Sequence, residues 1–263
     1  MKLRNKTVIV TAATRGIGLA CARACAAEGG RVYLAARNMD TAQARAKELC
    51  DAGFCVKAVY NDAGKPESFR SMAQFVAEDA GSIDVLINNF GTSDPKTDRT
   101  LRNTDTEDFL RTVELNLRSV FAGTQAVLPF MTKGGSIVNI SSVSSIVPDI
   151  SQVAYGTSKA AINYLTKLIA VQEARHQIRC NAVLPGMTAT EGVEKNLTEE
   201  FRNLFLRHIP LGRIGLPEEI AEAVCYFASD ASAYTTGQIL TVSGGFGLAT
   251  PVYGDLANKV NRR

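Results

Sequence analysis

The chain has 263 residues, of which 46% are hydrophobic and 21% are charged, and its formal net charge is +3. This composition is typical of a globular protein, and the dispersed basic residues indicate no nucleic-acid partner. No apolar run reaches the ~18 residues of a membrane-spanning helix, and the first residues lack the apolar core of a secretory signal. We therefore expect a cytoplasmic protein without a membrane partner.

Cysteine and histidine usage gives no sign of a metal site. The six cysteines, at positions 21, 25, 50, 55, 180 and 225, include no CxxC pair, and the two histidines, His176 and His208, lie far from any cysteine cluster. In a chain without a secretory signal, such cysteines are expected to be reduced and mostly buried. We predict no bound metal.

Short apolar segments alternate with amphipathic ones along almost the whole chain. Those typical of strands are 7–11, 31–36, 55–60, 84–88, 136–141, 178–184 and 239–242. Helical patterns follow them at 19–30, 40–52, 66–80, 106–128, from 155, and from 217. Continuous apolar strands alternating with amphipathic helices predict an α/β fold of the doubly wound, Rossmann type. Residues 1–263 are expected to form one domain, with a seven-stranded parallel sheet and helices on both faces.

The turn after the first strand carries glycines. Its sequence, Thr11–Gly18, is TAATRGIG. Glycines there let the backbone approach a pyrophosphate, and the helix N-terminus adds positive potential. The same glycines are equally consistent with a simple tight turn. A dinucleotide site is favoured by the position of this turn directly after the first strand, more than by the sequence of the turn itself.

The end of the second strand bears on the choice of cofactor. A carboxylate there holds the ribose 2′-hydroxyl in proteins that bind NAD. This chain has Ala36, Arg37 and Asn38 instead, and Arg15 lies in the glycine turn. Either arginine alone is consistent with a solvated surface charge. Together, two guanidiniums and no acid predict a 2′-phosphate, and therefore NADP(H).

Tyr155 and Lys159 are four residues apart at the start of a predicted helix. At ~1.5 Å per residue they lie about 6 Å apart along one helix face. A nearby ammonium favours the phenolate, so we expect Lys159 to lower the pKa of Tyr155. Ser142 follows the fifth strand, where functional groups of open α/β sheets gather. Alone, the pair is also consistent with an ordinary surface Tyr and Lys.

These pieces together resemble the short-chain dehydrogenase/reductase family over essentially the whole length. The family's motifs occur in order as TAATRGIG, Asp62, Asn88-Asn89-Phe90-Gly91, Asn116, Ser142, Tyr155, Lys159 and Pro185-Gly186. Two positions depart from the pattern. Ala12 replaces the usual glycine and is expected to make the turn slightly less open, and Phe90 replaces a small alanine and is expected beside the nicotinamide site.

The resemblance implies a site and a chemistry. Its catalytic set would be Asn116, Ser142, Tyr155 and Lys159, with Ser142 polarising the substrate oxygen and Tyr155 as general acid or base. Asn116 would hold a water, although a satisfied polar group at a helix kink is the alternative. Residues 1–140, approximately, would form the dinucleotide-binding part. The implied cofactor residues are Thr11, Thr14, Arg15, Gly16, Ile17, Gly18, Arg37, Asn38, Asp62, Ala63, Asn89, Gly91, Tyr155, Lys159, Pro185, Gly186 and Thr188.

Within the family, segments such as 146–151, IRCNAVLPG, the stretch from Leu197 to Ala221 and GGFGLATPVY are similar to clostridial NADP-dependent 7α-hydroxysteroid dehydrogenases. That similarity implies a bile acid or steroid as the small-molecule substrate. The segment at about 187–210 would be an apolar lid, or else ordinary helix packing. The tail at about 245–263 would close the pocket or mediate subunit contacts. The implied substrate residues are Phe90, Ser142, Val147, Tyr155, Leu197 and Phe201.

Two other functions stay open at this stage. The same chemistry could act on another carbonyl, such as a 3-oxoacyl carrier-protein thioester, for which Arg99 and Arg102 give faint support. A catalytically idle nucleotide-binding or scaffolding protein is the third hypothesis, against which the intact Ser, Tyr, Lys and Asn set argues. Apolar positions on more than one face of the helices at 106–128 and 155–175, with the family resemblance, imply a homotetramer.

Overall fold

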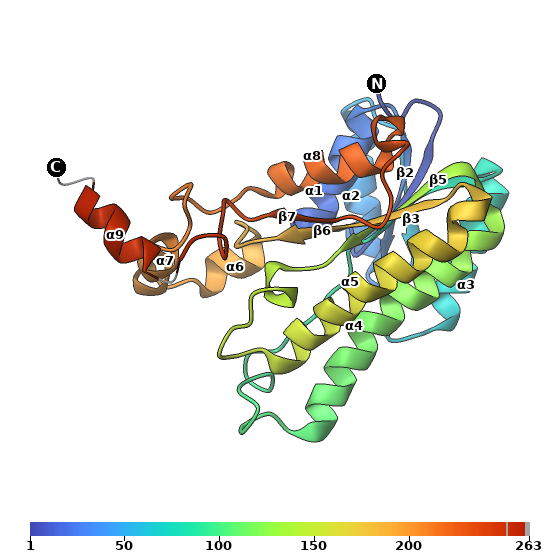
Figure 1. The fold of residues 1–263 in the computed structure, drawn as a ribbon. Helices are drawn as coiled ribbons and strands as arrows, with labels where there is room; N and C mark the ends of the chain where they lie inside the picture. The colour runs from blue at the N-terminus through green and yellow to red at the C-terminus, as the bar shows by residue number, and fades with distance from the viewer. Residues whose placement is uncertain (251, 261–263) are drawn as a thin grey trace.

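The computed structural model describes residues 1–250 and 252–260, and a seven-stranded parallel sheet forms its centre (Figure 1). The sheet order is β3-β2-β1-β4-β5-β6-β7. The strands are β1 (Thr7–Thr11), β2 (Arg31–Ala36), β3 (Val56–Tyr60), β4 (Ile83–Asn88), β5 (Met131–Ile140), β6 (Arg179–Pro185) and β7 (Ile239–Val242). The predicted fold class is confirmed.

Helices cover both faces of the sheet (Figure 1). One layer holds α1 (Gly16–Ala27), α2 (Met39–Asp51) and α8 (Pro217–Ala228), and the opposite layer holds α3 (Glu67–Ala80), α4 (Thr106–Val127) and α5 (Val153–Glu173). The inner strands β1 and β6 are apolar and fully buried because neither of their faces meets water, whereas the edge strands β3 and β7 are partly exposed. Short 3-10 helices complete the described part of this body: η1 (Leu128–Phe130), η2 (Val143–Ser145), η3 (Ala174–His176) and η4 (Asp230–Ser232).

The strand order fixes where a ligand can bind. β1 pairs with β2 on one side and with β4 on the other, so Val8 lies beside both Val32 and Val85. The chain winds outward in opposite directions from this point, which leaves a crevice at the carboxyl ends of β1 and β4. The glycine turn and Asn89 follow directly from those two strand ends.

The fifth strand begins earlier than the sequence pattern predicts. β5 starts at Met131 rather than at residue 136, because Met131 already pairs with Ile83. The register then shifts before Val85 pairs with Ser136. Residues 132–135 form the irregular part, where Gly134 adopts a φ of 83°. A short interruption of this kind hides the start of a strand from an apolar-run criterion.

The segment at about 187–210 contains α6 (Glu191–Asn196) and α7 (Glu199–Leu206), and the tail contains α9 (Tyr253–Val260). In Figure 1, α9 lies beside α7 at the end of the molecule away from α3. An ion pair between Arg207 and Asp255, at 2.5 Å, joins the two segments. Pro251 and residues 261–263 of the predicted tail lie outside the described residues. Among the helices that the structure describes, none is long and apolar enough to cross a membrane.

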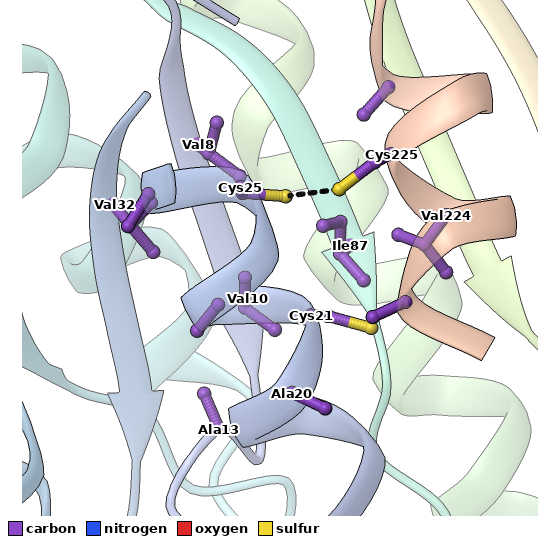
Figure 2. Packing of buried hydrophobic residues seen from close by; sticks show 14 of the residues in the cluster. Val8, Val10, Ala13, Ala20, Cys21, Cys25, Val32, Ile87, Val224 and Cys225 are labelled. Carbon is purple, nitrogen blue, oxygen red and sulfur yellow. Dashed lines mark hydrogen bonds between the residues drawn. The ribbon is translucent and has the colours of Figure 1, made fainter. Parts of the chain in front are cut away.

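Helix α1 packs on α8 through small side chains and thiols (Figure 2). Cys25 Sγ lies 3.7 Å from Cys225 Sγ, and Cys21 and Val224 fill the same layer. Burial raises the pKa of the Cys21 thiol far above its usual range. These cysteines, with Cys180, are buried, whereas Cys50 and Cys55 are exposed. The expectation of mostly buried thiols is confirmed.

This difference in burial predicts how the six cysteines react. Under native conditions we expect two thiols, Cys50 and Cys55, to react rapidly with a disulfide reagent, because thiolate formation is suppressed at buried sites. Unfolding should expose all six. Titration with 5,5′-dithiobis(2-nitrobenzoate) measures both counts, and the double variant Cys50→Ser, Cys55→Ser is the control that should lose the rapid phase. Four rapidly reacting thiols in the native protein would contradict the burial of the α1–α8 layer.

Candidate active site

The ends of β1 and β4 are tied together by Asn89. Its side-chain Nδ2 donates to the carbonyl oxygens of Thr11, at 3.1 Å, and Ala12, at 3.2 Å. Its backbone N–H donates to Thr11 Oγ1 at 2.9 Å. These bonds satisfy the polar groups that the diverging strands leave unpaired. They also fix the start of the glycine turn against the segment that follows β4.

The turn itself has room only for glycine at position 18. A Cβ atom there would lie 2.4 Å from Asn89 Nδ2 and 2.5 Å from the carbonyl oxygen of Ala12. Gly16 needs its own freedom, with a φ of 53°. Ala12 adopts a φ of 51°, the left-handed conformation that costs a non-glycine residue about 1–2 kcal/mol. The turn keeps its close packing despite the alanine, which is held there by the Asn89 bond.

Both predicted arginines lie exposed beside this turn. Arg15 directly precedes α1, and Arg37 follows β2. Across the described parts of the chain, neither guanidinium makes an ion pair or a side-chain hydrogen bond. Asn38 caps α2, accepting from the Thr41 N–H at 3.0 Å. The close-packed glycine turn, the open α1 N-terminus and two unpaired guanidiniums therefore fit a dinucleotide.

The other predicted cofactor residues surround the same crevice. Asp62 follows β3, and its Oδ1 accepts from the Gly64 N–H at 2.9 Å. Ala63 is buried, and the side chain of Ile17 packs on the core beneath α1. Thr188 is buried too, with its hydroxyl donating to the carbonyl of Gly186 at 3.0 Å. Its neighbour Thr190 lies over the glycine turn, since its methyl would be 3.2 Å from a Cβ placed on Gly16.

Tyr155 and Lys159 lie in the first two turns of α5, as their spacing predicts. Lys159 Nζ lies 5.6 Å from the centre of the Tyr155 ring and donates to the carbonyl oxygen of Ile140 at 2.8 Å. Ser142 follows β5, and its Oγ accepts from the N–H of Ser144 at 3.2 Å and lies 2.9 Å from Ser144 Oγ. The structure therefore brings the Ser, Tyr and Lys side chains to one end of the sheet.

Burial controls the pKa values of this group. Desolvation raises the pKa of Tyr155, and a hydrogen bond with Ser142 offsets part of that rise. Desolvation lowers the pKa of Lys159 to about 8, because the residue is only 2% exposed. The prediction that Lys159 lowers the pKa of Tyr155 is wrong for this structure: the Nζ is bonded to Ile140, and burial of the phenol is the larger effect.

Asn116 is fully buried in α4 and reaches the loop after β4. Its Oδ1 accepts from the Thr92 N–H at 2.8 Å, and its Nδ2 donates to the Thr92 carbonyl at 2.9 Å and to Ser158 Oγ at 3.0 Å. Both amide hydrogens are thus used within the protein. Asn116 holds residues 91–92 against α5, where a Cβ on Gly91 would lie 2.8 Å from Lys159 Nζ. These contacts match the alternative interpretation of Asn116, a polar side chain whose hydrogen bonds are satisfied within the protein.

The predicted substrate residues divide into two groups. Val147 contacts the tail, since a Cβ on Gly247 would lie 2.4 Å from Val147 Cγ2. Phe201 stacks on Phe205 with centroids 6.0 Å apart, and Phe205 stacks on the tail residue Phe246 at 4.7 Å. Leu197 joins α6 to α7 in the same region.

Phe90 differs from that group. It is half-buried and packs against the core cluster beneath α3, α4 and α5. At least part of the ring therefore contributes to the core, and a role beside the nicotinamide stays a prediction.

Sequence reasoning missed Asp98. This carboxylate is 2% exposed, and it accepts from the backbone N–H groups of Ala154 and Tyr155. The contact spans 57 residues, so no local pattern announces it. It brings the loop after β4 directly to the start of the helix that carries Tyr155.

Comparison with known proteins agrees with this arrangement. A family model described as enoyl-(acyl carrier protein) reductase matches residues 11–247. A solved short-chain type dehydrogenase/reductase from Mycobacterium marinum superimposes with a TM-score of 0.88 at 35% identity, covering 94% of this chain and 98% of that one. The chain belongs to the short-chain dehydrogenase/reductase family. It is therefore an oxidoreductase, and the family implies a nicotinamide nucleotide as cofactor.

Two curated relatives in this family bear on the substrate. A 7alpha-hydroxysteroid dehydrogenase from Clostridium sardiniense is 50% identical over 256 residues, which cover 97% of this chain and 98% of the relative. A 3-oxoacyl-[acyl-carrier-protein] reductase from Thermotoga maritima is 38% identical over 250 residues, covering 93% and 99%. This dehydrogenase/reductase is thus similar along its length to enzymes named for different substrates.

The buried ammonium of Lys159 is predicted to lower the stability of this reductase at neutral pH. The folded pKa of Lys159, about 8, lies below the ordinary 10.5, so the charged form is disfavoured by folding. Lys159→Met should therefore raise the free energy of unfolding at pH 7 by about 1–3 kcal/mol, net of the lost bond to Ile140. Between pH 8 and 10.5 only the unfolded wild type binds this proton, so wild-type stability rises and the advantage of the variant should shrink.

Denaturant unfolding of both proteins across this pH range measures the effect. Lys167→Met is the matched control, because Lys167 is exposed on the same helix. It should leave stability nearly unchanged at every pH. A Lys159→Met variant less stable than the wild type at pH 7 would contradict a net cost of burying this charge.

Proposed function

We propose that this enzyme interconverts a 7α-hydroxyl and a 7-ketone on bile acids with NADP(H), in either direction. The observation that carries the proposal is the 50% identity with a 7alpha-hydroxysteroid dehydrogenase over nearly the whole of both chains. The site described above supports it with a complete Ser142, Tyr155 and Lys159 set beside a glycine turn.

In this proposal the protein moves the proton and the bound cofactor supplies or accepts the hydride. The Tyr155 hydroxyl gives its proton to the ketone oxygen in reduction and takes it back in oxidation. Its raised pKa keeps the phenol protonated at neutral pH, which suits the acid role in the free enzyme. Ser142 donates a hydrogen bond to the same oxygen. Lys159 and Asn116 hold the surrounding backbone in place through Ile140 and Thr92.

An apolar ligand is supported by the side chains near the carboxyl end of the sheet. Exposed apolar side chains come from the loop after Ser142, from α7 and from the tail. They are Ile146, Ile150, Phe201, Leu204 and Leu248. Burying a rigid apolar nucleus against such groups contributes roughly 25 cal/mol per Å² before the costs of binding. We propose that α6 and α7 cover the steroid and that Val147, Leu197 and Phe201 contact it.

A second function is favoured by one specific observation, the 38% identity with a 3-oxoacyl-[acyl-carrier-protein] reductase. That reaction would use the same proton donor on a flexible, acidic partner. The lower identity and the exposed apolar groups of α7 favour the steroid over it. A non-catalytic nucleotide-binding role has the least support, because all four expected catalytic residues are present.

We also propose a homotetramer, in which a second copy covers the outer faces of α4 and α5. These helices lie side by side and leave an apolar groove of about 480 Å³, whose large apolar or aromatic lining side chains are Leu117, Phe121, Tyr164, Leu165 and Leu168. Phe121 is 53% exposed and Tyr164 is 66% exposed, which is unusual for so apolar a surface. The cytoplasmic location of the enzyme stays a prediction.

The cofactor prediction rests on Arg37. Arg37→Ala should weaken NADPH binding about ten- to a hundredfold and leave NADH binding almost unchanged, because a charge-assisted bond to phosphate is worth ~1.5–3 kcal/mol. Adding Ala36→Asp should move the preference to NADH. Titration of each nucleotide by fluorescence measures both, and Arg23→Ala, an exposed arginine of α1, is the matched control. Equal affinity of the wild type for NADH and NADPH would overturn the assignment.

The substrate prediction is tested with the purified enzyme and NADPH. We expect turnover of 7-oxo bile acids well above that of 3-oxoacyl thioesters and simple ketones. Tyr155→Phe should remove nearly all turnover and keep NADPH affinity, because the phenol acts on the substrate oxygen. Phe201→Ala should raise KM for the steroid more than for a small ketone. Ready turnover of 3-oxoacyl thioesters with none of 7-oxo bile acids would favour the second function instead.

Assembly is tested through the groove. Phe121→Glu combined with Leu168→Glu should dissociate the tetramer, because each copy would bury two uncompensated charges in the interface. Multi-angle light scattering at micromolar concentration measures the mass. Phe75→Glu, at a 46% exposed side chain on α3, is the control and should leave the mass unchanged. A monomeric wild type would contradict the proposal.

A further inference from the structure

Helix α5 begins without a cap from its own sequence. Gln152 precedes it in the left-handed conformation, with a φ of 59°, and its side chain makes no capping bond to the helix. The first N–H groups of a helix have no partner within the helix and need an acceptor from elsewhere. In this chain the third helical residue is Tyr155, so the turn that lacks a local cap is the one that carries the reacting phenol.

Asp98 supplies the missing acceptors from the loop after β4. Its Oδ1 accepts from the Ala154 N–H at 2.8 Å, and its Oδ2 accepts from the Tyr155 N–H at 2.9 Å. The carboxylate is 2% exposed, and a negative charge at a helix N-terminus is stabilised by the helix dipole. Both bonds are charge-assisted and short, so this cap is stronger than a neutral one.

Further bonds hold the loop in register with the helix. Ser93 Oγ donates to Asp98 Oδ2 at 3.2 Å, and Gln152 Nε2 donates to Ser93 Oγ at 3.3 Å. The Val153 N–H donates to the carbonyl of Arg99 at 3.2 Å. Three consecutive N–H groups at the start of α5 therefore find acceptors in residues 98–99, which leaves this turn little freedom to fray.

The other end of the same loop is fixed at Lys159. Asn116 holds Thr92 by two backbone bonds, and Gly91 lies against the Lys159 ammonium. Residues 91–99 thus run from the lysine to the N–H of the tyrosine. A displacement at Asp98 would move Tyr155 relative to Lys159 and the end of β5.

We propose that Asp98 is a positioning residue for the reaction, which holds the Tyr155 hydroxyl at its working place through the backbone of the first turn of α5. The proposal rests on the proposed role of Tyr155 as proton donor. Asp98 belongs to the loop after β4 and contacts the backbone of α5, so its loss should slow the chemical step and leave nucleotide affinity unchanged. Misplacement of a reacting group by about 1 Å costs on the order of a hundredfold in rate.

The test compares Asp98→Ala and Asp98→Asn with Asp105→Ala. Asp105 caps α4 through the Glu107 N–H at 2.9 Å, so its loss removes the same kind of bond elsewhere in the protein. Asp98→Ala should lower kcat about ten- to a hundredfold with the NADPH Kd within threefold. Asp98→Asn, whose amide oxygen keeps one of the two bonds, should lie between it and the wild type. Asp105→Ala removes one exposed capping bond, so it should lower Tm by less and keep kcat within twofold.

Hydrogen exchange of a peptide spanning residues 153–158 gives a second measurement that needs no turnover. Exchange should accelerate in both Asp98 variants and not in Asp105→Ala. Unchanged kcat with accelerated exchange would overturn the positioning role, as would a loss of NADPH affinity equal to the loss of kcat. If Asp98→Ala does not fold, Asp98→Asn decides. If the wild type reduces no ketone, the proposed function fails, and unchanged exchange would then overturn the cap itself.

Discussion

The buried ammonium of Lys159 is the constraint on which the rest of the site depends. A lysine that is 2% exposed needs close polar partners for its charge, and among the residues that the structure describes its ammonium donates to the Ile140 carbonyl at the end of β5. That bond ties α5 to the sheet, and a second one, from Ser141 Oγ to the Lys159 carbonyl, ties it again. The loop after β4 must then come close without a side chain, which is what Gly91 permits.

The fold and the shared helix of Tyr155 and Lys159 were predictable because their signals are local. Alternating apolar strands and amphipathic helices predict the sheet, and four-residue spacing predicts that Tyr155 and Lys159 share a helix face. Effects that depend on three-dimensional surroundings were not predictable. Sequence spacing does not show how deeply a phenol is buried. The pKa of Tyr155 is therefore raised by burial, where the spacing predicted that Lys159 would lower it. The Asp98 cap joins residues 57 apart, and the early start of β5 is hidden by a register shift.

The two departures from the family pattern are absorbed in different ways. Ala12 keeps the left-handed backbone that a glycine would adopt and is held there by the Asn89 side chain. The conformational penalty is confined to Ala12, whose carbonyl oxygen packs closely against Gly18. Phe90 is accommodated by a change of side-chain environment, because its ring packs on the core beneath α3 to α5. Phe90 therefore adds apolar contact between the end of β4 and the layer of α3, α4 and α5.

The contacts of the tail within the chain join two segments that lie far apart in the sequence. Gly247, with a φ of 79°, lies so close to Val147 that no side chain fits between them. The neighbouring Phe246 stacks on Phe205 of α7. One short piece of the tail thus joins the loop after Ser142 to the helix proposed to cover the substrate, within a single chain. Aromatic stacking favours the contact between the tail and α7, and close packing leaves no space between the tail and Val147, so the loop after Ser142 and α7 are joined through the tail although they lie about 60 residues apart in the sequence.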